Sequence, residues 1–401
     1  MADTPKASGY LTAREAAAAL GVTPATLYAY VSRGLVRSEA TSGRERRYHA
    51  TDIALLRRRQ TRDPQAAAEG ALNFGAPVLD SAITLILDGH LYYRGQDAAV
   101  LARTASIREV AALLWQGDPA VIFAAENLPE TGEAFAIRRR AAAGLAPIER
   151  CLSLLPAAAA ADPRAADLAP DAVASTGARI LRLLAAIAAD AEPSPRPIDA
   201  VLADAWGAGA GTRALIRAAL ILCADHELNV SAFTARCIAS ARASPYNAVL
   251  GGMAALQGAW HGGATERADA FLGDAFAAAD VAAFCAEKLR LGERLPGFGH
   301  PLYPQGDPRA RVLLDLLRES DRPLIAQGLQ VAKSVGELIG RPPNIDFALA
   351  LLRRSLALPT GTGLAFFAVG RTVGWVAQAL EQYATGQIIR PRARYVGPPA
   401  R

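Results

Sequence analysis

The chain has 401 residues, of which 52% are hydrophobic and only 6% aromatic, and its formal net charge is +5. Because alanine is abundant and favours helices over strands, we expect a mainly α-helical protein of two or three domains. Uninterrupted apolar runs such as 218–224 are too short to span a bilayer, and residues 1–9 lack the apolar core of a secretory signal. We therefore expect a cytoplasmic protein that does not contact a membrane.

The positive charge is concentrated near the N-terminus. Residues 1–70 contain 11 Lys or Arg against 7 Asp or Glu, an excess of four out of the total of five. Such asymmetry indicates an anionic partner for this segment. The four cysteines show no Cys-x-x-Cys spacing and lie in apolar stretches, so we expect reduced, buried thiols.

Residues 11–59 have the signals of a small helical module. Thr12 with Glu15 three residues later predicts a capping box for a helix over 13–20, which Gly21 ends. Pro24 predicts the first turn of a second helix that Gly34 closes. Two short helices joined by a tight turn are typical of a helix-turn-helix. A basic hairpin over 37–49 and a third helix over 51–59 are expected to follow.

This module resembles the winged-helix modules of MerR-type regulators, through Thr26-Leu27-Tyr28-x-Tyr30, Gly34-Leu35 and Arg47-Tyr48. The resemblance implies that the second helix enters the major groove of DNA and that the hairpin lies along phosphates. The residues expected to contact phosphate are Arg33, Arg44, Arg46 and Arg47. Two alternatives stay open: the module has lost its DNA target, or it serves only in assembly.

A short hairpin is predicted after a linker, over 84–87 and 91–93, with Asp88-Gly89 at its turn. Nearly everything after residue 97 is helical by pattern. The alanine-rich stretch 140–197 is punctuated by prolines, and we expect helices with loops near 156–170.

Three of the five histidines stand beside glycines or at helix ends: His226, His261 in His-Gly-Gly, and His300 in Pro-Gly-Phe-Gly-His. Histidine transfers protons near neutral pH, and glycine lets backbone approach a ligand closely. Together with the carboxylate of Asp346 and several arginines, the histidines could deprotonate a carbon next to a carbonyl and bind a dicarboxylate. The spacing does not favour a metal site.

Beyond residue 78 the chain resembles citrate synthases and 2-methylcitrate synthases. The resemblance is strong after residue 212 and vague over 120–210. The motifs that carry it, in order, are 83–95 (ITLILDGHLYYRG), 106–117 (SIREVAALLWQG), 225–231 (DHELNVS), 256–264 (LQGAWHGGA), 296–300 (PGFGH) with 307–309 (DPR), 344–347 (NIDF), 370–375 (GRTVGW) and 389–395 (IRPRARY).

The resemblance implies a role for each residue of the site. Asp346 would take a proton from the acyl-CoA, His261 would stabilise the enol, and His300 would polarise and protonate the ketone of oxaloacetate. The product would be citrate or 2-methylcitrate plus CoA, with acetyl-CoA or propionyl-CoA as donor. The residues implied to bind oxaloacetate are His226, Arg309, Arg371 and, in the neighbouring subunit's site, Arg390.

The resemblance also implies a homodimer, no cofactor beyond the acyl-CoA substrate, and three regions. These are a module with its linker over 1–75, a large helical domain over 76–261 and 351–401, and a small helical domain over 262–350. The chain departs from the usual family pattern at Pro301, Pro304, Thr265 and Gln378. The rival hypothesis is a regulator whose synthase-like body senses a metabolite while residues 1–70 bind DNA.

Overall fold

A computed structural model of the chain describes residues 10–40, 46–50, 52–53, 56, 79–208, 210–320, 322–393 and 395–398. The chain divides into two compact units, residues 1–80 and 81–401. The predicted linker lies almost wholly outside the described residues, and so does most of the third helix predicted over 51–59.

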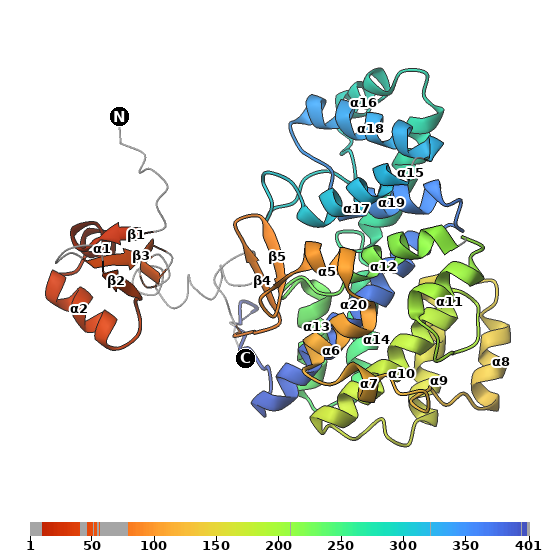
Figure 1. Cartoon of the computed structure of the whole chain (residues 1–401), viewed down its shortest axis with the longest axis horizontal. Coiled ribbons are helices and arrows are strands. Elements are labelled where there is room, and N and C mark those ends of the chain that lie inside the picture. Colours follow the sequence, from red (N-terminus) through yellow and green to blue (C-terminus); the bar gives the residue numbers. More distant parts are fainter. Residues whose placement is uncertain are drawn as a thin grey trace. The chain divides into compact units, whose positions relative to one another are not determined.

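The first unit is a helix-turn-helix with a three-stranded antiparallel sheet (Figure 1). Its elements are β1 (Tyr10–Thr12), α1 (Ala13–Leu20), α2 (Pro24–Ser32), β2 (Ser38–Ala40) and β3 (Arg46–His49), and the strand order is β1-β3-β2.

The helix signals of the first unit are confirmed residue by residue. Thr12 and Glu15 form the capping box of α1, and Gly21 ends the helix with a φ of 65°. Pro24 is the first residue of α2. The predicted basic hairpin is formed by β2 and β3. Strand β1 was not predicted. It forms by pairing with β3, which lies far away in the sequence, and no local pattern indicates such a pairing.

The second unit begins with a small antiparallel sheet formed by β4 (Thr84–Leu87), β5 (His90–Tyr93) and β6 (Gln96–Asp97). The predicted hairpin turn is confirmed, because Asp88 and Gly89 have φ angles of 50° and 77°. Positive φ at both central residues is the turn geometry that matches strand twist. The buried hydroxyl of Tyr93 donates a hydrogen bond to the carbonyl of Ile221 at 2.9 Å, which ties the sheet to the helices.

The remainder of the second unit is helical, as predicted. A group of helices from α15 to α19 packs together at one end of this unit, at the top of Figure 1, while α20 runs through the other helices. The helices are α5 (Ala98–Thr104), α6 (Ile107–Trp115), α7 (Pro119–Ile122), α8 (Glu133–Ala141), α9 (Pro147–Ala161), α10 (Pro170–Ala188), α11 (Ile198–Ala205), α12 (Arg213–Leu222), α13 (Val230–Ser240), α14 (Pro245–Leu256), α15 (Gly263–Ala277), α16 (Val281–Arg290), α17 (Pro308–Glu319), α18 (Pro323–Ile339), α19 (Ile345–Ser355) and α20 (Thr362–Thr385), with a short 3-10 turn η1 (Ala210–Thr212).

Helix α20 is the central element of the core. It packs against α6, α9, α10, α12, α13, α14, α15 and α19. Its length and composition would allow it to cross a membrane, which the sequence analysis missed because polar residues interrupt its apolar runs. However, 94% of its most apolar window is buried inside the protein, as in the core helix of a globular domain.

The loop predicted near residues 156–170 is present, and Pro156 lies inside the helix before it. Helix α9 continues through Pro156 to Ala161, and the loop occupies only residues 162–169. A proline inside a helix removes one backbone hydrogen bond. The helix persists because Leu154, Leu155 and Ala158 are buried in the core on both sides of the proline.

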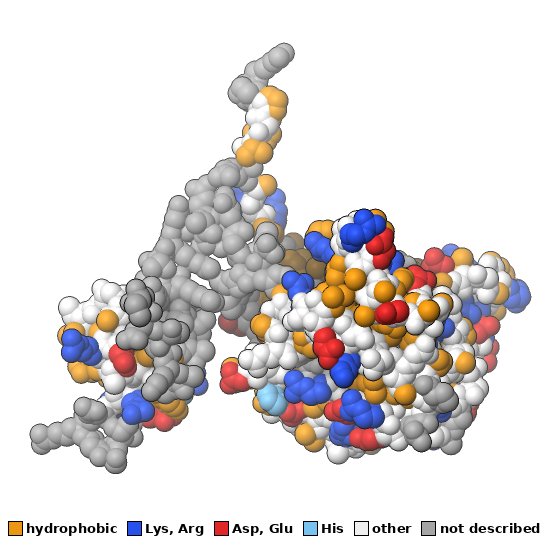
Figure 2. Space-filling model, turned by 90° about the horizontal axis from the view of Figure 1, so that it is seen from above, with side chains coloured by type: hydrophobic (Ala, Val, Ile, Leu, Met, Phe, Trp, Pro, Cys, Tyr) orange, Lys and Arg blue, Asp and Glu red, His pale blue; other side chains and the backbone are white. Residues whose placement is uncertain are grey.

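The face of the second unit in Figure 2 carries Lys and Arg interspersed with Asp and Glu. Hydrophobic side chains lie among these charges. This mixed face contrasts with the basic excess of residues 1–70.

Candidate active site

His226 lies just beyond α12, in a turn where Glu227 adopts a positive φ of 51°. Its Nε2 atom is 2.9 Å from the hydroxyl of Tyr303, and its ring is edge-on to that of His300 at 5.1 Å between centroids. Two of the three histidines picked out by sequence therefore share one buried cluster, together with Tyr303 from the turn after the second.

His300 lies at the end of a glycine-containing loop, and hydrogen bonds join this loop to the segment that leads into α19. Gly297 and Gly299 have φ angles of 89° and 75°, which other residues rarely adopt. The N–H of Gly299 donates to the carbonyl of Pro342 at 2.8 Å, and Asn344 donates from its side chain to the carbonyl of Gly299 at 3.0 Å. Two motifs that lie about 45 residues apart are thereby held side by side.

His261 stands at the turn before α15, as predicted. A Cβ atom on Gly262 would come within 2.6 Å of a Leu256 methyl carbon, so the turn requires glycine. The Nε2 atom of His261 is 2.9 Å from the hydroxyl of Ser231, and its ring is edge-on to Phe367 at 5.9 Å.

Two buried arginines complete the polar cluster, and their pairing differs. Arg309 is 3% exposed and forms a two-pronged ion pair with Asp307, with Nε to Oδ1 at 2.9 Å and Nη2 to Oδ2 at 2.8 Å. Arg371 is 1% exposed and uses only its Nε, which donates to the carbonyl of Cys223 at 2.7 Å. Neither terminal nitrogen of Arg371 has a hydrogen-bond partner among the described residues.

A buried guanidinium whose two terminal nitrogens lack hydrogen-bond partners favours a nearby anion. Buried polar groups are nearly always hydrogen-bonded, and an uncompensated buried charge is costly. Two free N–H edges of a planar fork match a carboxylate in two-pronged geometry. The two terminal nitrogens of Arg371 can therefore hold a carboxylate.

Asp346 is the second residue of α19, whose N-cap is Asn344. Its Oδ1 accepts a hydrogen bond of 2.6 Å from the hydroxyl of Thr265, and no described residue donates to its Oδ2. Burial raises the pKa of Asp346 to about 6, although the Thr265 hydroxyl and the charge of Arg309 act against the rise. A carboxyl that titrates near neutral pH, with one free oxygen, is suited to act as a base.

The three histidines are neutral at pH 7. Burial lowers the pKa of His261 and of His300 to about 4 each, and the charge of Arg309 adds to both shifts. Burial, again with Arg309, also holds the pKa of His226 well below its usual value. Because Arg309 acts on all three and on Asp346, the four groups form one electrostatic unit.

The hydrogen bonds define the tautomer of His300. Its Nδ1 atom accepts a hydrogen bond from the backbone N–H of Leu302 at 3.2 Å. A neutral ring that accepts at Nδ1 carries its proton on Nε2. His300 can therefore donate a hydrogen bond from Nε2 to an oxygen atom.

The predicted residues that are described outside this cluster are exposed. Arg390 follows the end of α20, and among the described residues no hydrogen bond or ion pair joins it to the cluster. Arg33 ends α2, and Arg46 and Arg47 lie on β3. Arg44 lies outside the described residues.

Sequence reasoning missed several groups that contact the site. These are Tyr303 beside His226, Ser231 beside His261, and Thr265 beside Asp346. Ser231 and Thr265 lie inside or next to the quoted motifs, but local sequence does not show which side chain they touch. Among the described residues, no three His, Cys, Asp or Glu side chains come together as a metal site.

The fold and this cluster define a mostly helical protein whose buried site can move a proton at carbon and hold a dicarboxylate. Residues 72–392 match the family described as "Citrate synthase, C-terminal domain", and residues 11–61 match "MerR HTH family regulatory protein". The chain belongs to the citrate synthase family, with a MerR-type helix-turn-helix at its N-terminus.

Curated relatives match over part of their length. Citrate synthase 2 of Bacillus subtilis is 36% identical over 45% of this chain and 50% of its own length. Citrate synthase of Haloferax volcanii is 37% identical over 45% of this chain and 49% of its own length. The matched segment thus spans about half of each relative.

The fold is similar to solved structures over a longer span. The crystal structure of citrate synthase from Thermotoga maritima matches with a TM-score of 0.67 and 26% identity, over 81% of this chain and 94% of that chain. The similarity covers the helical unit rather than only its C-terminal motifs.

Proposed function

We propose that the protein condenses an acyl-CoA, acetyl-CoA or propionyl-CoA, with oxaloacetate to give citrate or 2-methylcitrate and CoA. The observation that carries this proposal is the buried carboxyl of Asp346, which has one free oxygen and lies in one electrostatic unit with three neutral histidines. Binding a metabolite requires no base. A base beside hydrogen-bond donors is required to form and trap an enol.

The first step is proton removal from the carbon next to the thioester carbonyl. Asp346 takes this proton on Oδ2, and electron density moves onto the thioester oxygen. His261 donates a hydrogen bond to that oxygen. The Ser231 hydroxyl lies 2.8 Å from Asn229 Oδ1 and 2.9 Å from His261 Nε2. The O–H donates to Asn229 Oδ1, so it must turn to Nε2 for the ring proton to be on Nδ1, from which it can be donated to the thioester oxygen.

The second step forms the new carbon–carbon bond. The enol carbon attacks the ketone carbon of oxaloacetate, and the ketone oxygen takes the proton from Nε2 of His300. The imidazole is then reprotonated as Asp346 gives up the proton that it took, so both groups return to their starting states. Arg371 and Arg309 hold the carboxylates, with His226 as a further donor. Water then hydrolyses the thioester, which releases the CoA thiol and the tricarboxylate. In a homodimer, Arg390 would reach the partner subunit's site.

The test is release of free thiol from acetyl-CoA and from propionyl-CoA by the purified full-length chain. We expect release that requires oxaloacetate, and the ratio of the two rates identifies the donor. The control omits oxaloacetate. Binding of oxaloacetate without thiol release from either donor would refute the enzyme and leave a metabolite sensor.

The rate should fall in acid because the base must be ionised. Since the pKa of Asp346 in the free protein is raised to about 6, we expect kcat/KM to be steady above about pH 7 and to fall tenfold per pH unit well below pH 6. Thiol release measured at a series of pH values across this range gives the acid limb, which is the part of the rate profile where activity falls as pH falls. A rate that stays constant down to about pH 4.5 would mean that Asp346 is not the base.

A second candidate function is DNA binding by the first unit, favoured by the match of residues 11–61 to a DNA-binding family. Arg33, Arg46 and Arg47 are exposed on this unit. Helix α2 contains no Lys, Arg, Asn or Gln, which are the side chains that most often read base edges. Binding would therefore depend mainly on phosphate contacts and hence on salt.

We expect the full-length chain to shift duplex DNA at low salt and to release it as salt rises. Replacing Arg46 and Arg47 together by alanine should reduce the slope of log affinity against log salt by about 2. The matched control is Arg318→Ala, an exposed arginine on α17. No shift at low salt, or an equal slope in the double variant, would argue for a module that serves another purpose.

A further inference from the structure

Thr265 is the one described residue whose side chain donates a hydrogen bond to the Asp346 carboxyl. Its Oγ1 lies 2.6 Å from Asp346 Oδ1, and the residue is 1% exposed. An ionised carboxylate can only accept hydrogen bonds, so the threonine hydroxyl must be the donor. The bond occupies one carboxylate oxygen and leaves the other for the substrate proton.

The surrounding packing fixes the direction of this hydroxyl. Thr265 belongs to the first turn of α15, and its methyl group faces the start of α20. A Cβ on Gly363 would lie 3.1 Å from that methyl carbon, so glycine at this position makes room for it. The methyl and hydroxyl groups of threonine are both bonded to Cβ and rotate together about χ1. Packing that fixes the position of the methyl group therefore also fixes the direction of the hydroxyl.

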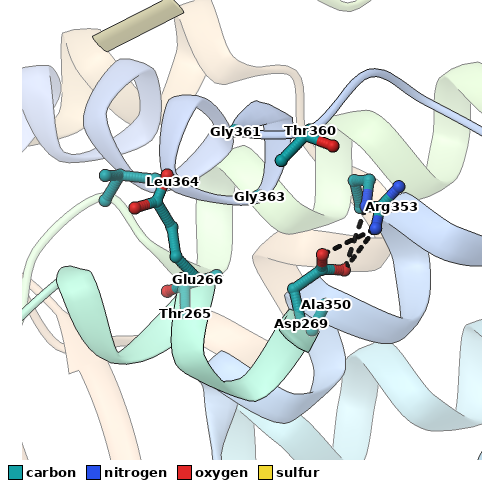
Figure 3. Close-up of a pocket in the computed structure, with 9 residues that line it drawn as sticks. All are labelled: Thr265, Glu266, Asp269, Ala350, Arg353, Thr360, Gly361, Gly363 and Leu364. Atoms are coloured by element: carbon teal, nitrogen blue, oxygen red, sulfur yellow. Dashed lines mark hydrogen bonds and ion pairs between the residues drawn. The ribbon is translucent and has the colours of Figure 1, made fainter. Parts of the chain in front are cut away.

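Thr265 also lines a cavity of about 40 Å³, together with Gly361, Gly363 and Leu364 from the start of α20 (Figure 3). Asp269 and Arg353 form an ion pair on the opposite wall of this cavity. Thr265 therefore contacts both the cavity and Asp346. A valine has the same shape as threonine but puts a methyl group where the hydroxyl lies 2.6 Å from Asp346 Oδ1, so the carboxyl would have to turn away from it, while a serine keeps the hydroxyl.

Charged groups from several elements also act on Asp346. Arg309 on α17 and Arg267 on α15 favour its ionised form, whereas Asp307 at the start of α17 opposes it. The Cys223 thiol, at the end of α12, interacts with Asp346 as well. All of these act through space, whereas the Thr265 hydroxyl is the side-chain group that is hydrogen-bonded to the carboxyl among the described residues.

We propose that Thr265 is a positioning residue for Asp346: its hydroxyl holds Oδ1 and aims Oδ2 at the acyl carbon that loses a proton. This inference rests on the proposed function. The bond is stronger to the ionised carboxylate than to the protonated form, so it also favours the state that can act as base. Thr265 acts through Asp346 and does not itself touch substrate.

The test compares Thr265→Val, which removes the hydroxyl, with Thr265→Ser, which keeps it. We expect Thr265→Val to lower kcat about 10-fold, because the base is no longer aimed, with KM values almost unchanged. The acid limb of its rate profile should move up by about 0.5–1 pH unit. Thr265→Ser should keep most of the rate, and its acid limb should lie close to that of the unaltered chain.

The matched control is Thr372→Val. Thr372 is also fully buried, but its hydroxyl donates to the carbonyl of Ala368 in its own helix. This variant should leave the pH profile unchanged. An unchanged limb and rate in Thr265→Val would overturn the proposal. Equal loss in the valine and serine variants would also overturn it, because the methyl would then be the important group.

A readout that does not need turnover separates this proposal from the proposed function. Infrared difference spectra between each protein and its Asp346→Asn counterpart report the protonation of this carboxyl. The pH at which half of this carboxyl is protonated should be higher in Thr265→Val than in the unaltered chain. A wild-type chain without activity would refute the synthase, while the infrared midpoints would still support or overturn the contact.

Discussion

Replacing Asp346 by asparagine is expected to lower kcat by about 10²- to 10⁴-fold, the contribution of a positioned base. Asparagine has the same shape, and its amide oxygen can still accept from Thr265, so the site geometry should survive. KM values should change little because the arginines and histidines that bind oxaloacetate remain. Steady-state thiol release with both substrates varied measures the two effects separately.

The same variant should be more stable than the unaltered chain at neutral pH. Burial raises the pKa of Asp346 from 3.8 to about 6, so the folded state favours the protonated form. Above about pH 6 the folded protein must hold a poorly solvated charge, and this cost is absent in acid. Removing the charge should raise the free energy of unfolding at pH 7 by about 2–3 kcal/mol.

Asp274→Asn is the matched control, since Asp274 is an exposed aspartate on α15. It should change neither kcat nor stability by a measurable amount. If Asp346→Asn kept more than about a tenth of the activity, another group would have to be the base. If it were less stable than the unaltered chain at pH 7, the buried carboxyl would be better solvated than its surroundings indicate.

Local signals predicted local structure well. Thr12 with Glu15, Gly21 and Pro24 set the limits of α1 and α2, because caps and proline act within one turn of the chain. Asp88-Gly89 gave the hairpin turn for the same reason. Strands β1 and β6 were missed, because each is short and exists only through a partner strand.

Packing explains why the loop predicted near 156–170 begins only at residue 162. The tendency of proline to end a helix is a local preference, and the buried Leu154, Leu155 and Ala158 around Pro156 outweigh it. Residues outside the core would not have supplied this compensation. Tertiary contacts therefore decide where this helix ends.

The same difference between local signals and long-range contacts applies to the residues of the site. His226, His261, His300 and Asp346 were found because they lie in motifs with unusual composition. The contacts made by Tyr303 and Thr265 were not, because they join residues 77 and 81 positions apart. The unpaired ends of Arg371 also emerge only from the fold, since a sequence cannot show which guanidinium lacks a partner.

Asp307→Ala is expected to destabilise the protein by about 3–5 kcal/mol, the cost of leaving one member of a buried ion pair alone. Asp307 accepts two bonds from the Arg309 side chain and one from the backbone N–H of Ile345 at 3.0 Å. It therefore ties the start of α17 to the start of α19. The midpoint of urea unfolding should fall at an unchanged slope.

The pH dependence of this loss has a definite sign. Burial opposes ionisation of Asp307, but the charge and hydrogen bonds of Arg309 outweigh it, so the pKa of Asp307 lies below its usual value. The stabilisation is then present above about pH 4, the pKa of an unfolded aspartate, and is lost as pH falls further. The difference between Asp307→Ala and the unaltered chain should shrink in acid.

Asp315→Ala is the control, because Asp315 forms only an exposed pair with Arg318 and such pairs contribute little. An Asp307→Ala midpoint equal to that of the control would mean that Arg309 finds another partner. Asp307 and Asp346 are both buried carboxylates near Arg309, yet their removal should have opposite effects on stability. Asp307 is fully paired and holds the fold, whereas Asp346 is left with a free oxygen, and that unsatisfied group is the one available for chemistry.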